Sequence, residues 1–348
     1  FDKGSSPRKL DSAPSCEAEA MAKSAPCVSA PSGLRMYENA SLADLALPAG
    51  IVLVAATLAR MIAMRLVLEP LAVWAVGEGS NVEFTRTKFV QAAWRTILYA
   101  TACTLAVKVM FLTEELPWIY DSSLFWIDWP NHELTEGMAS VYALYAGFYV
   151  HQLVYLFLDV KTSDFVALLV HHIITLGLVV SSFVMKFTRV GLFVMLLHDV
   201  SDVFLESAKC FNYMKDGPRH WLHKGADVCF VVFAISFFSL RLYIYPVRVL
   251  WPVASPDGVC QYATCASTEL GGATWDHCAV KPAYTAFTGL LGGLQLLQVF
   301  WGWKVLMVVW TILSGKELED PRDDASEEDS KRRSSRELDP SSRRSEED

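Results

Sequence analysis

The chain has 348 residues, of which 53% are apolar and 12% aromatic, and its formal net charge at pH 7 is −8. Much of the apolar content is gathered into seven long runs, which argues against a soluble all-α protein with buried helices. We expect a membrane protein, with the lipid bilayer as a partner and no nucleic-acid partner.

The seven runs approach or exceed the length that a membrane-spanning helix needs. About 20 apolar residues cross roughly 30 Å of hydrocarbon. Short connections with turn or charged residues separate most of the runs, as expected for antiparallel neighbours. The sequence therefore predicts an all-α, polytopic bundle of about seven transmembrane helices, near residues 45–67, 88–112, 137–160, 164–184, 189–209, 227–250 and 284–313.

The two ends of the chain have a different composition. Residues 1–40 are rich in Ala, Ser and Pro with scattered charge, so we expect a disordered N-terminal segment. Residues 41–80 would hold the first transmembrane helix and its connection. Residues 316–348 hold 13 acidic and 8 basic side chains, which predicts a disordered acidic tail.

Loop charge predicts the orientation in the membrane. Basic residues gather in the loops after spans 1, 3 and 5, whereas the loop near 114–136 has several acids and no Lys or Arg. The positive-inside rule then puts the N-terminus in the lumen and the tail in the cytoplasm. Lys186, Arg189 and Lys281 run against this assignment.

Two features fit a lumenal assignment. Asn39, followed by Ala40 and Ser41, is a glycosylation sequon on the predicted lumenal side, although it lies close to the first span. The loop near 251–283 holds Cys260, Cys265 and Cys278, and an oxidising lumen would permit one disulfide among them. The sequence does not choose among the three pairings.

Ionisable side chains are concentrated in the stretch from His171 to Lys209. Such groups are costly inside a bilayer, by at least ~2.5 kcal/mol for a central Asp on insertion scales, so they indicate a functional site. Spans 4 and 5 form a hairpin with its turn near residue 186 or 187. Because a helix rises about 1.5 Å per residue, His171 and His172 should lie level with Asp202.

Other ionisable residues extend this set. In span 5, His198, Asp202 and Glu206 share one helical stripe, with Asp199 one position around. His151 in span 3 lies at a similar depth, but a lone intramembrane histidine more often bonds a neighbouring helix. The candidate catalytic residues are therefore His171, His172, His198, Asp199 and Asp202.

Imidazole with a carboxylate behind it suits general base catalysis, and imidazole can itself be an acyl-accepting nucleophile. The sequence has no Gly-Xaa-Ser-Xaa-Gly motif, which favours histidine as the centre of acyl transfer. Metal binding is the competing use, but His171 and His172 are an isolated pair without the spacing of a histidine box. We expect no metal and no bound cofactor.

The same residues resemble the Lag motif of ceramide synthases, in the TLC-domain superfamily. The resemblance rests on the pattern HHxxTxxLxxxS…RxGxxxxxxHDxxDxxLExxK, which begins at His171 and ends at Lys209. It extends over about residues 60–315, so that 81–315 would be a TLC catalytic membrane domain enclosing a lipid cavity.

The resemblance implies an endoplasmic reticulum enzyme that transfers a fatty acyl group from a long-chain acyl-CoA co-substrate to the amine of a sphingoid base. It implies catalytic roles for His171, His172, Asp199 and Asp202, and an acyl-histidine intermediate, for which His171 is the first choice. We further expect Asp202 to hold His171, and basic residues of the cytoplasmic rim to meet the CoA phosphates; these include Lys161, Lys209, Arg219 and Lys224.

Two alternatives stay open at this point. One is a non-catalytic TLC-domain protein that binds lipid or assists translocation, and such relatives often lack the HDxxD acids that are present here. The other is a metal-dependent lipid hydroxylase. A homo- or hetero-dimer is compatible with the sequence, which does not choose between these and a monomer.

Overall fold

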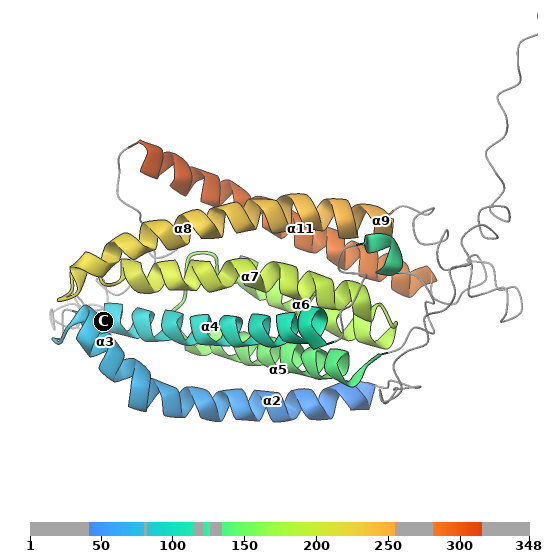
Figure 1. Cartoon of the computed structure of the whole chain (residues 1–348), viewed down its shortest axis with the longest axis horizontal. Helices are drawn as coiled ribbons and strands as arrows, with labels where there is room; N and C mark the ends of the chain where they lie inside the picture. The colour runs from blue at the N-terminus through green and yellow to red at the C-terminus, as the bar shows by residue number, and fades with distance from the viewer. Residues whose placement is uncertain (1–41, 80–81, 114–120, 126–133, 255–280, 315–348) are drawn as a thin grey trace, which may run out of the picture.

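The computed structural model describes residues 42–79, 82–113, 121–125, 134–254 and 281–314. These residues form long helices that run side by side in one bundle, and no strand occurs among them (Figure 1). The all-α prediction is confirmed. The sequon at Asn39, the cysteines of the 251–283 loop and the acidic tail lie outside the described residues.

Within the described residues, seven helical rods follow one another. In order, the elements are α2 (Leu42–Ala63) with η1 (Met64–Leu68) and α3 (Glu69–Val76), α4 (Glu83–Val107) with η3 (Lys108–Thr113), η5 (Ser122–Phe125), α5 (Glu136–Leu158), α6 (Phe165–Val184), α7 (Thr188–Asn212), η6 (His220–His223) with α8 (Lys224–Ser236), η7 (Phe237–Ile244), η8 (Pro246–Leu250) and α9 (Trp251–Ala254), and α11 (Lys281–Leu313).

Five of the rods have the length and apolar character of a membrane span, namely 42–76, 136–158, 165–184, 220–254 and 285–313. The other two, α4 and α7, have 25 residues each and run alongside the five (Figure 1). Their sequences hold more ionisable residues, since α7 alone includes Asp199, Asp202 and Glu206. The protein is therefore a multi-pass membrane protein, and about seven spans are compatible with this geometry.

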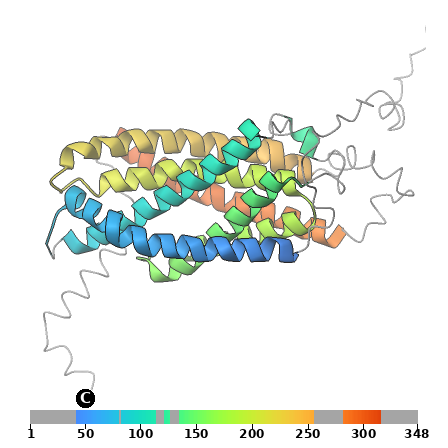
Figure 2. The ribbon, with the colours of Figure 1, turned by 60° about the horizontal axis from the view of Figure 1, so that its bottom comes forward.

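The apolar residues divide between the lipid face and the core. Large side chains of α2, such as Leu47, Ile51 and Val54, are more than half exposed, as a surface against hydrocarbon tails requires. By contrast, most of α7 from Thr188 to Asp199 is buried. Figure 1 shows α7 inside the bundle, between α4 and α8, and Figure 2 shows α2 on the outside. The polar helix α7 is thus shielded from lipid.

The predicted hairpin is present. Helix α6 ends at Val184, α7 begins at Thr188, and Lys186 between them adopts a left-handed conformation with φ of 60°. At the other end of α7, a short connection leads to α8. We call this second end the α7–α8 end; there α3 packs closely against the connection, since a Cβ on Gly217 would lie 2.6 Å from the carbonyl oxygen of Ala75.

The rod that begins with α8 changes its winding halfway. From Phe237 to Leu250 it is mostly π-helical, and Pro246 begins the second π-helical segment. Proline cannot donate the usual helical hydrogen bond, so a local change of winding accommodates it. The π-helical segment carries Arg241, which the bundle buries. This local irregularity places a charged side chain next to α7.

Candidate active site

A cavity of about 220 Å³ opens among α4, α5, α6, α7, α8 and α11, in the half of the bundle nearest the α7–α8 end. Its apolar wall includes Phe230, Phe233 and Phe237 from the α8 rod and Val305 and Val308 from α11. Its polar and ionisable lining includes Arg95, Tyr99, Gln152, Asp159, Lys161, His171, His172, Asp202, Glu206, Lys209, Arg241, Trp301 and Lys304.

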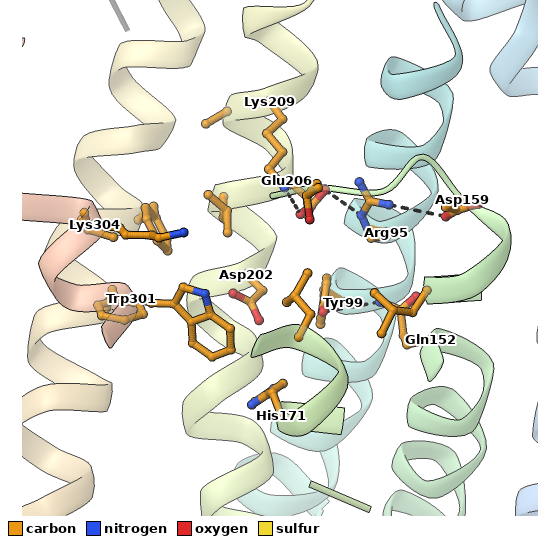
Figure 3. A pocket seen from close by; sticks show the side chains of 18 of the residues that line it. Arg95, Tyr99, Gln152, Asp159, His171, Asp202, Glu206, Lys209, Trp301 and Lys304 are labelled. Carbon is orange, nitrogen blue, oxygen red and sulfur yellow. Dashed lines mark hydrogen bonds and ion pairs between the residues drawn. The ribbon is translucent and has the colours of Figure 1, made fainter. Parts of the chain in front are cut away.

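Both histidines of the predicted pair line this cavity, and Figure 3 shows His171 there. The ring of His171 contacts the indole of Trp301 edge-on, with 5.3 Å between ring centroids and 83° between planes. The centroid of His172 lies 5.6 Å from that of His171, and the side chain is buried. The Nδ1 atoms of both rings are buried and have no hydrogen-bond partner among the described residues.

Asp202 lines the same cavity, but its ion pair is not with His171. Its Oδ1 lies 2.7 Å from Nη2 of Arg241, and no hydrogen bond joins Asp202 to His171 among the described residues. Arg241 is 5% exposed and also donates to the carbonyl of His198 and, at 3.4 Å, to Oε1 of Gln298. The expected pairing of His171 with Asp202 is thus replaced by an arginine that we did not predict.

The two remaining candidates from α7 face away from this cavity. The Nδ1 of His198 lies 2.8 Å from the carbonyl oxygen of Val194, and Asp199 accepts a hydrogen bond of 2.7 Å from the hydroxyl of Tyr149. Neither side chain is among those that line the cavity. Residues three apart on a helix differ in direction by about 60°, and here Asp199 contacts Tyr149 of α5 while Asp202 lines the cavity.

His151 contacts its neighbours in the manner of a packing residue. It is fully buried, its Nε2 accepts from Trp94 Nε1 at 3.2 Å, and its Nδ1 lies 3.4 Å from Thr57 Oγ1. It does not line the cavity. This arrangement agrees with the expected role of bonding neighbouring helices.

Five charged residues form a chain of ion pairs along one wall of the cavity. Arg60 of α2 lies 2.5 Å from Asp159, which also approaches Arg95 at 3.5 Å. Arg95 in turn pairs with Glu206 at 2.9 Å, and Glu206 pairs with Lys209 at 2.6 Å. Figure 3 shows the last four of these residues at the pocket. This series of ion pairs joins α2, α4, α7 and the end of α5.

The four basic residues expected at the rim fall into two groups. Lys161 and Lys209 line the cavity, whereas Arg219 and Lys224 do not. The guanidinium of Arg219 instead lies over the ring of Trp74, 4.9 Å from its centroid.

Three further cations in the lining were not predicted, namely Arg95, Arg241 and Lys304. Each is an ionisable residue within a helical rod of the bundle, a feature that marks a candidate but does not show which cavity the side chain lines.

A second, smaller cavity of about 30 Å³ adjoins His171 on the side away from the α7–α8 end. Its lining is mainly apolar and includes Leu178, Met195, Phe287 and Leu291. Since His171 lines both cavities, its imidazole lies between a polar compartment and an apolar one.

No group of three or more His, Cys, Asp or Glu side chains could hold a metal ion in the part of the chain that the structure describes. The described cysteines, Cys103, Cys210 and Cys229, are free.

Comparison with known proteins agrees with this geometry. Residues 88–307 match the TLC domain family, a range that includes every lining residue of the large cavity except Val308. The chain therefore belongs to the TLC-domain family. The matched segment begins after Arg60, so α2 lies outside it.

The curated relatives narrow this class. The chain is 31% identical to ceramide synthase LOH2 of Arabidopsis thaliana over 281 residues, which cover 78% of this chain and 88% of that protein. It is 32% identical to human ceramide synthase 5 over 241 residues, or 69% of this chain and 55% of the relative. For human ceramide synthase 1 the identity is 32% over 248 residues, or 68% and 64%. Within its family the chain belongs with the ceramide synthases, and it spans little more than half of the human ceramide synthase 5.

Proposed function

We propose that the protein transfers a fatty acyl group from acyl-CoA to the amine of a sphingoid base in the endoplasmic reticulum membrane. Its membership of the ceramide synthases supports this reaction. The observation that carries the proposal is the position of His171 between the polar cavity and the small apolar one. A thioester needs that combination, because its acyl chain is apolar and its CoA part is polar and anionic.

The first step is acyl transfer to His171. A nitrogen of its imidazole attacks the thioester carbonyl, the carbon–sulfur bond breaks, and the sulfur leaves as CoA with the proton that the imidazole loses on acylation. The acyl chain lies along the apolar lining toward Phe287 and Leu291. The edge-on contact with Trp301 restricts the orientation of the His171 ring for this attack.

The second step consumes the acyl-histidine. The neutral amine of the sphingoid base attacks the acyl carbon, the bond from that carbon to the imidazole nitrogen breaks, and an amide forms. The proton lost by the amine passes through a base at the cavity to the departing imidazole nitrogen, which restores neutral His171. Asp202 serves as this base, because it lines the cavity and is paired with one cation, whereas Asp159 and Glu206 are each paired with two. The ion pair with Arg241 holds the Asp202 carboxylate in one orientation for this role.

The orientation of the chain follows from the same proposal. The CoA part of acyl-CoA is polar and stays in the water of the cytoplasm. The polar cavity lies near the α7–α8 end, so this end would face the cytoplasm. The connection there carries Lys215, Arg219 and Lys224, in agreement with the positive-inside rule. The N-terminus would then be lumenal and the acidic tail cytoplasmic.

The test uses the full chain in membranes from cells without this activity. Sphinganine is supplied with a panel of acyl-CoAs, and N-acyl products are measured by mass spectrometry. We expect a CoA-releasing activity that a metal chelator does not change and that His171→Ala abolishes. A wild-type protein without N-acyl product would favour a lipid-binding protein, and a chelator-sensitive oxidised product would favour a hydroxylase. Arg65→Gln serves as a comparison, because Arg65 is exposed and lines neither cavity.

A further inference from the structure

The ionisable side chains that line the large cavity are not balanced in charge. Three are acidic, namely Asp159, Asp202 and Glu206. Five are cationic, namely Arg95, Lys161, Lys209, Arg241 and Lys304. The cavity lining therefore carries an excess of two positive charges when its histidines are neutral.

All three acids already have cationic partners. Asp159 is paired with Arg60 and Arg95, and Asp202 is paired with Arg241. Glu206 is paired with Arg95 and Lys209. A ligand that recruited Arg95 or Lys209 would have to compete with carboxylates held within 2.9 Å. These two cations are therefore poorly available to an incoming anion.

Lys161 and Lys304 are in a different position. Neither has a carboxylate within 4.0 Å among the described residues; the ammonium of Lys161 lies 5.2 Å from the ring centroid of Phe165, and that of Lys304 lies 4.9 Å from that of Phe300. A cation beside an aromatic ring at a solvated site is stabilised only weakly, by roughly 0.5–1 kcal/mol. Both ammonium groups can therefore take an anion without breaking an ion pair.

One hydrogen bond places the two lysines in the same region. The indole Nε1 of Trp301 donates to Oδ2 of Asp164 at 3.0 Å, which ties α11 to the start of α6. Lys161 precedes Asp164 by three residues, and Lys304 follows Trp301 by three. Because α6 and α11 run in opposite directions, both lysines lie on the side of His171 nearest the α7–α8 end (Figure 1). Figure 3 shows Lys304 across the pocket from Arg95 and Asp159.

We propose that Lys161 and Lys304 form an anion subsite that binds the phosphate groups of the CoA part of the donor. This inference rests on the proposed function. Two ammonium groups without carboxylates match the charge of a phosphate dianion, and phosphate oxygens accept the charge-assisted hydrogen bonds that lysine donates. The same excess charge disfavours the ammonium form of the sphingoid base in the cavity, so it selects the neutral amine.

The phosphate of a membrane lipid headgroup has the same chemistry as that of CoA, so the experiment must separate the two sources. The purified full chain in nanodiscs is assayed with sphinganine and two donors with the same acyl chain, acyl-CoA and the phosphate-free acyl-pantetheine. The variants are Lys161→Ala, Lys304→Ala and the double variant. Arg65→Gln is the control, because Arg65 is exposed on η1 and does not line the cavity. All measurements are repeated with phosphatidic acid added to zwitterionic nanodiscs.

We expect each single variant to raise the KM for acyl-CoA about tenfold, the effect of losing one charge-assisted contact. The kcat/KM for acyl-pantetheine should not change in any variant, and Arg65→Gln should match the wild type with both donors. Equal losses with the two donors, or no loss with either, would overturn the subsite. An effect of the variants seen only when phosphatidic acid is present would assign the lysines to a lipid headgroup and overturn the assignment to CoA.

A failure of the proposed function gives a distinct result. In that case the wild type makes no N-acyl product from either donor. Binding of free CoA to the wild type and to the double variant, measured by calorimetry, then decides on the subsite alone. Weaker binding by the double variant supports the subsite, and equal binding rejects it.

Discussion

Asp202 of α7 is held by Arg241, whose Nη2 lies 2.7 Å from its Oδ1. The two residues are 39 positions apart and come from helices that pack along their length (Figure 1). Arg241 is itself anchored by the carbonyl of His198 and by Gln298 of α11. A buried pair of this kind leaves an uncompensated charge when one partner is removed, which typically costs about 3–5 kcal/mol.

Arg241→Met should therefore both destabilise the protein and slow acyl transfer, because Asp202 loses its partner. We expect Arg241→Lys to recover part of the activity. Pairing Arg241→Met with Asp202→Asn should cost less stability than the sum of the single changes, since neither charge is then left alone. Thermal unfolding in detergent measures the loss of stability, and steady-state kcat measures the slowing of acyl transfer. Additive losses of stability would show that the ion pair has no energetic role.

Arg60 couples α2 to the cavity wall through Asp159. Arg60→Met should lower the free energy of unfolding by about 1–3 kcal/mol, since a charge-assisted contact is lost while Asp159 keeps Arg95. Arg60→Lys should retain most of the wild-type free energy of unfolding, because its ammonium can still pair with Asp159. The measurement is the unfolding midpoint of the two variants in the same detergent. If Arg60→Met unfolds like the wild type, α2 is not coupled to the site by this pair.

Gly147 sets how closely α5 approaches α2. A Cβ at this position would lie 2.5 Å from the carbonyl oxygen of Ala49 and 2.7 Å from Cβ of Val52. Gly147→Ala should thus destabilise the bundle by about 1–3 kcal/mol, the usual cost of overpacking. Gly50→Ala on α2 is the control, because its Cβ would have nothing within 4 Å. We expect the control to unfold at or slightly above the wild-type temperature; equal unfolding midpoints for the two variants would contradict the close packing.

The small apolar cavity beyond His171 should limit the length of the acyl chain. Leu291→Ala enlarges the space at its lining, so the ratio of long to short N-acyl products should rise relative to the wild type. A destabilisation of about 2–5 kcal/mol is expected for this deletion, so the products are compared as a ratio and not as a rate. Leu296→Ala changes a lipid-exposed residue of the same helix and should leave the ratio unchanged. An unaltered ratio in Leu291→Ala would show that the acyl chain does not occupy the small cavity.

The sequence was sufficient for the features that depend on periodicity within one segment. The length of the apolar runs and the turn near residue 186 predicted the α6–α7 hairpin, and the ionisable residues marked the cavity that contains His171, His172 and Asp202. The expectation that residues at equal counts from the turn lie at equal depth was a weaker guide to side-chain contacts. It placed Asp202 level with His171, but it could not say that a third helix would supply the partner of Asp202.

Arg241 and Lys304 escaped prediction for a physical reason. Each lies in a mainly apolar stretch of helix, and the side chains that Arg241 contacts, Asp202 and Gln298, come from helices that are distant in sequence. The π-helical winding from Phe237 onward also changes which face Arg241 occupies, and no apolar pattern reports that rotation. His198 and Asp199 do not line the large cavity, although His198 lines the smaller one, because the motif that includes them does not indicate which cavity each residue faces.

The central claim is that His171 carries the acyl group. The most direct measurement is peptide mass spectrometry of the purified full chain after incubation with acyl-CoA in the absence of a sphingoid base. The account predicts an acyl mass addition on His171 that disappears when sphinganine is added and that is missing in His171→Ala. N-acyl product formed at the normal rate by His171→Ala, or an acyl group found on another residue and chased by sphinganine, would contradict it.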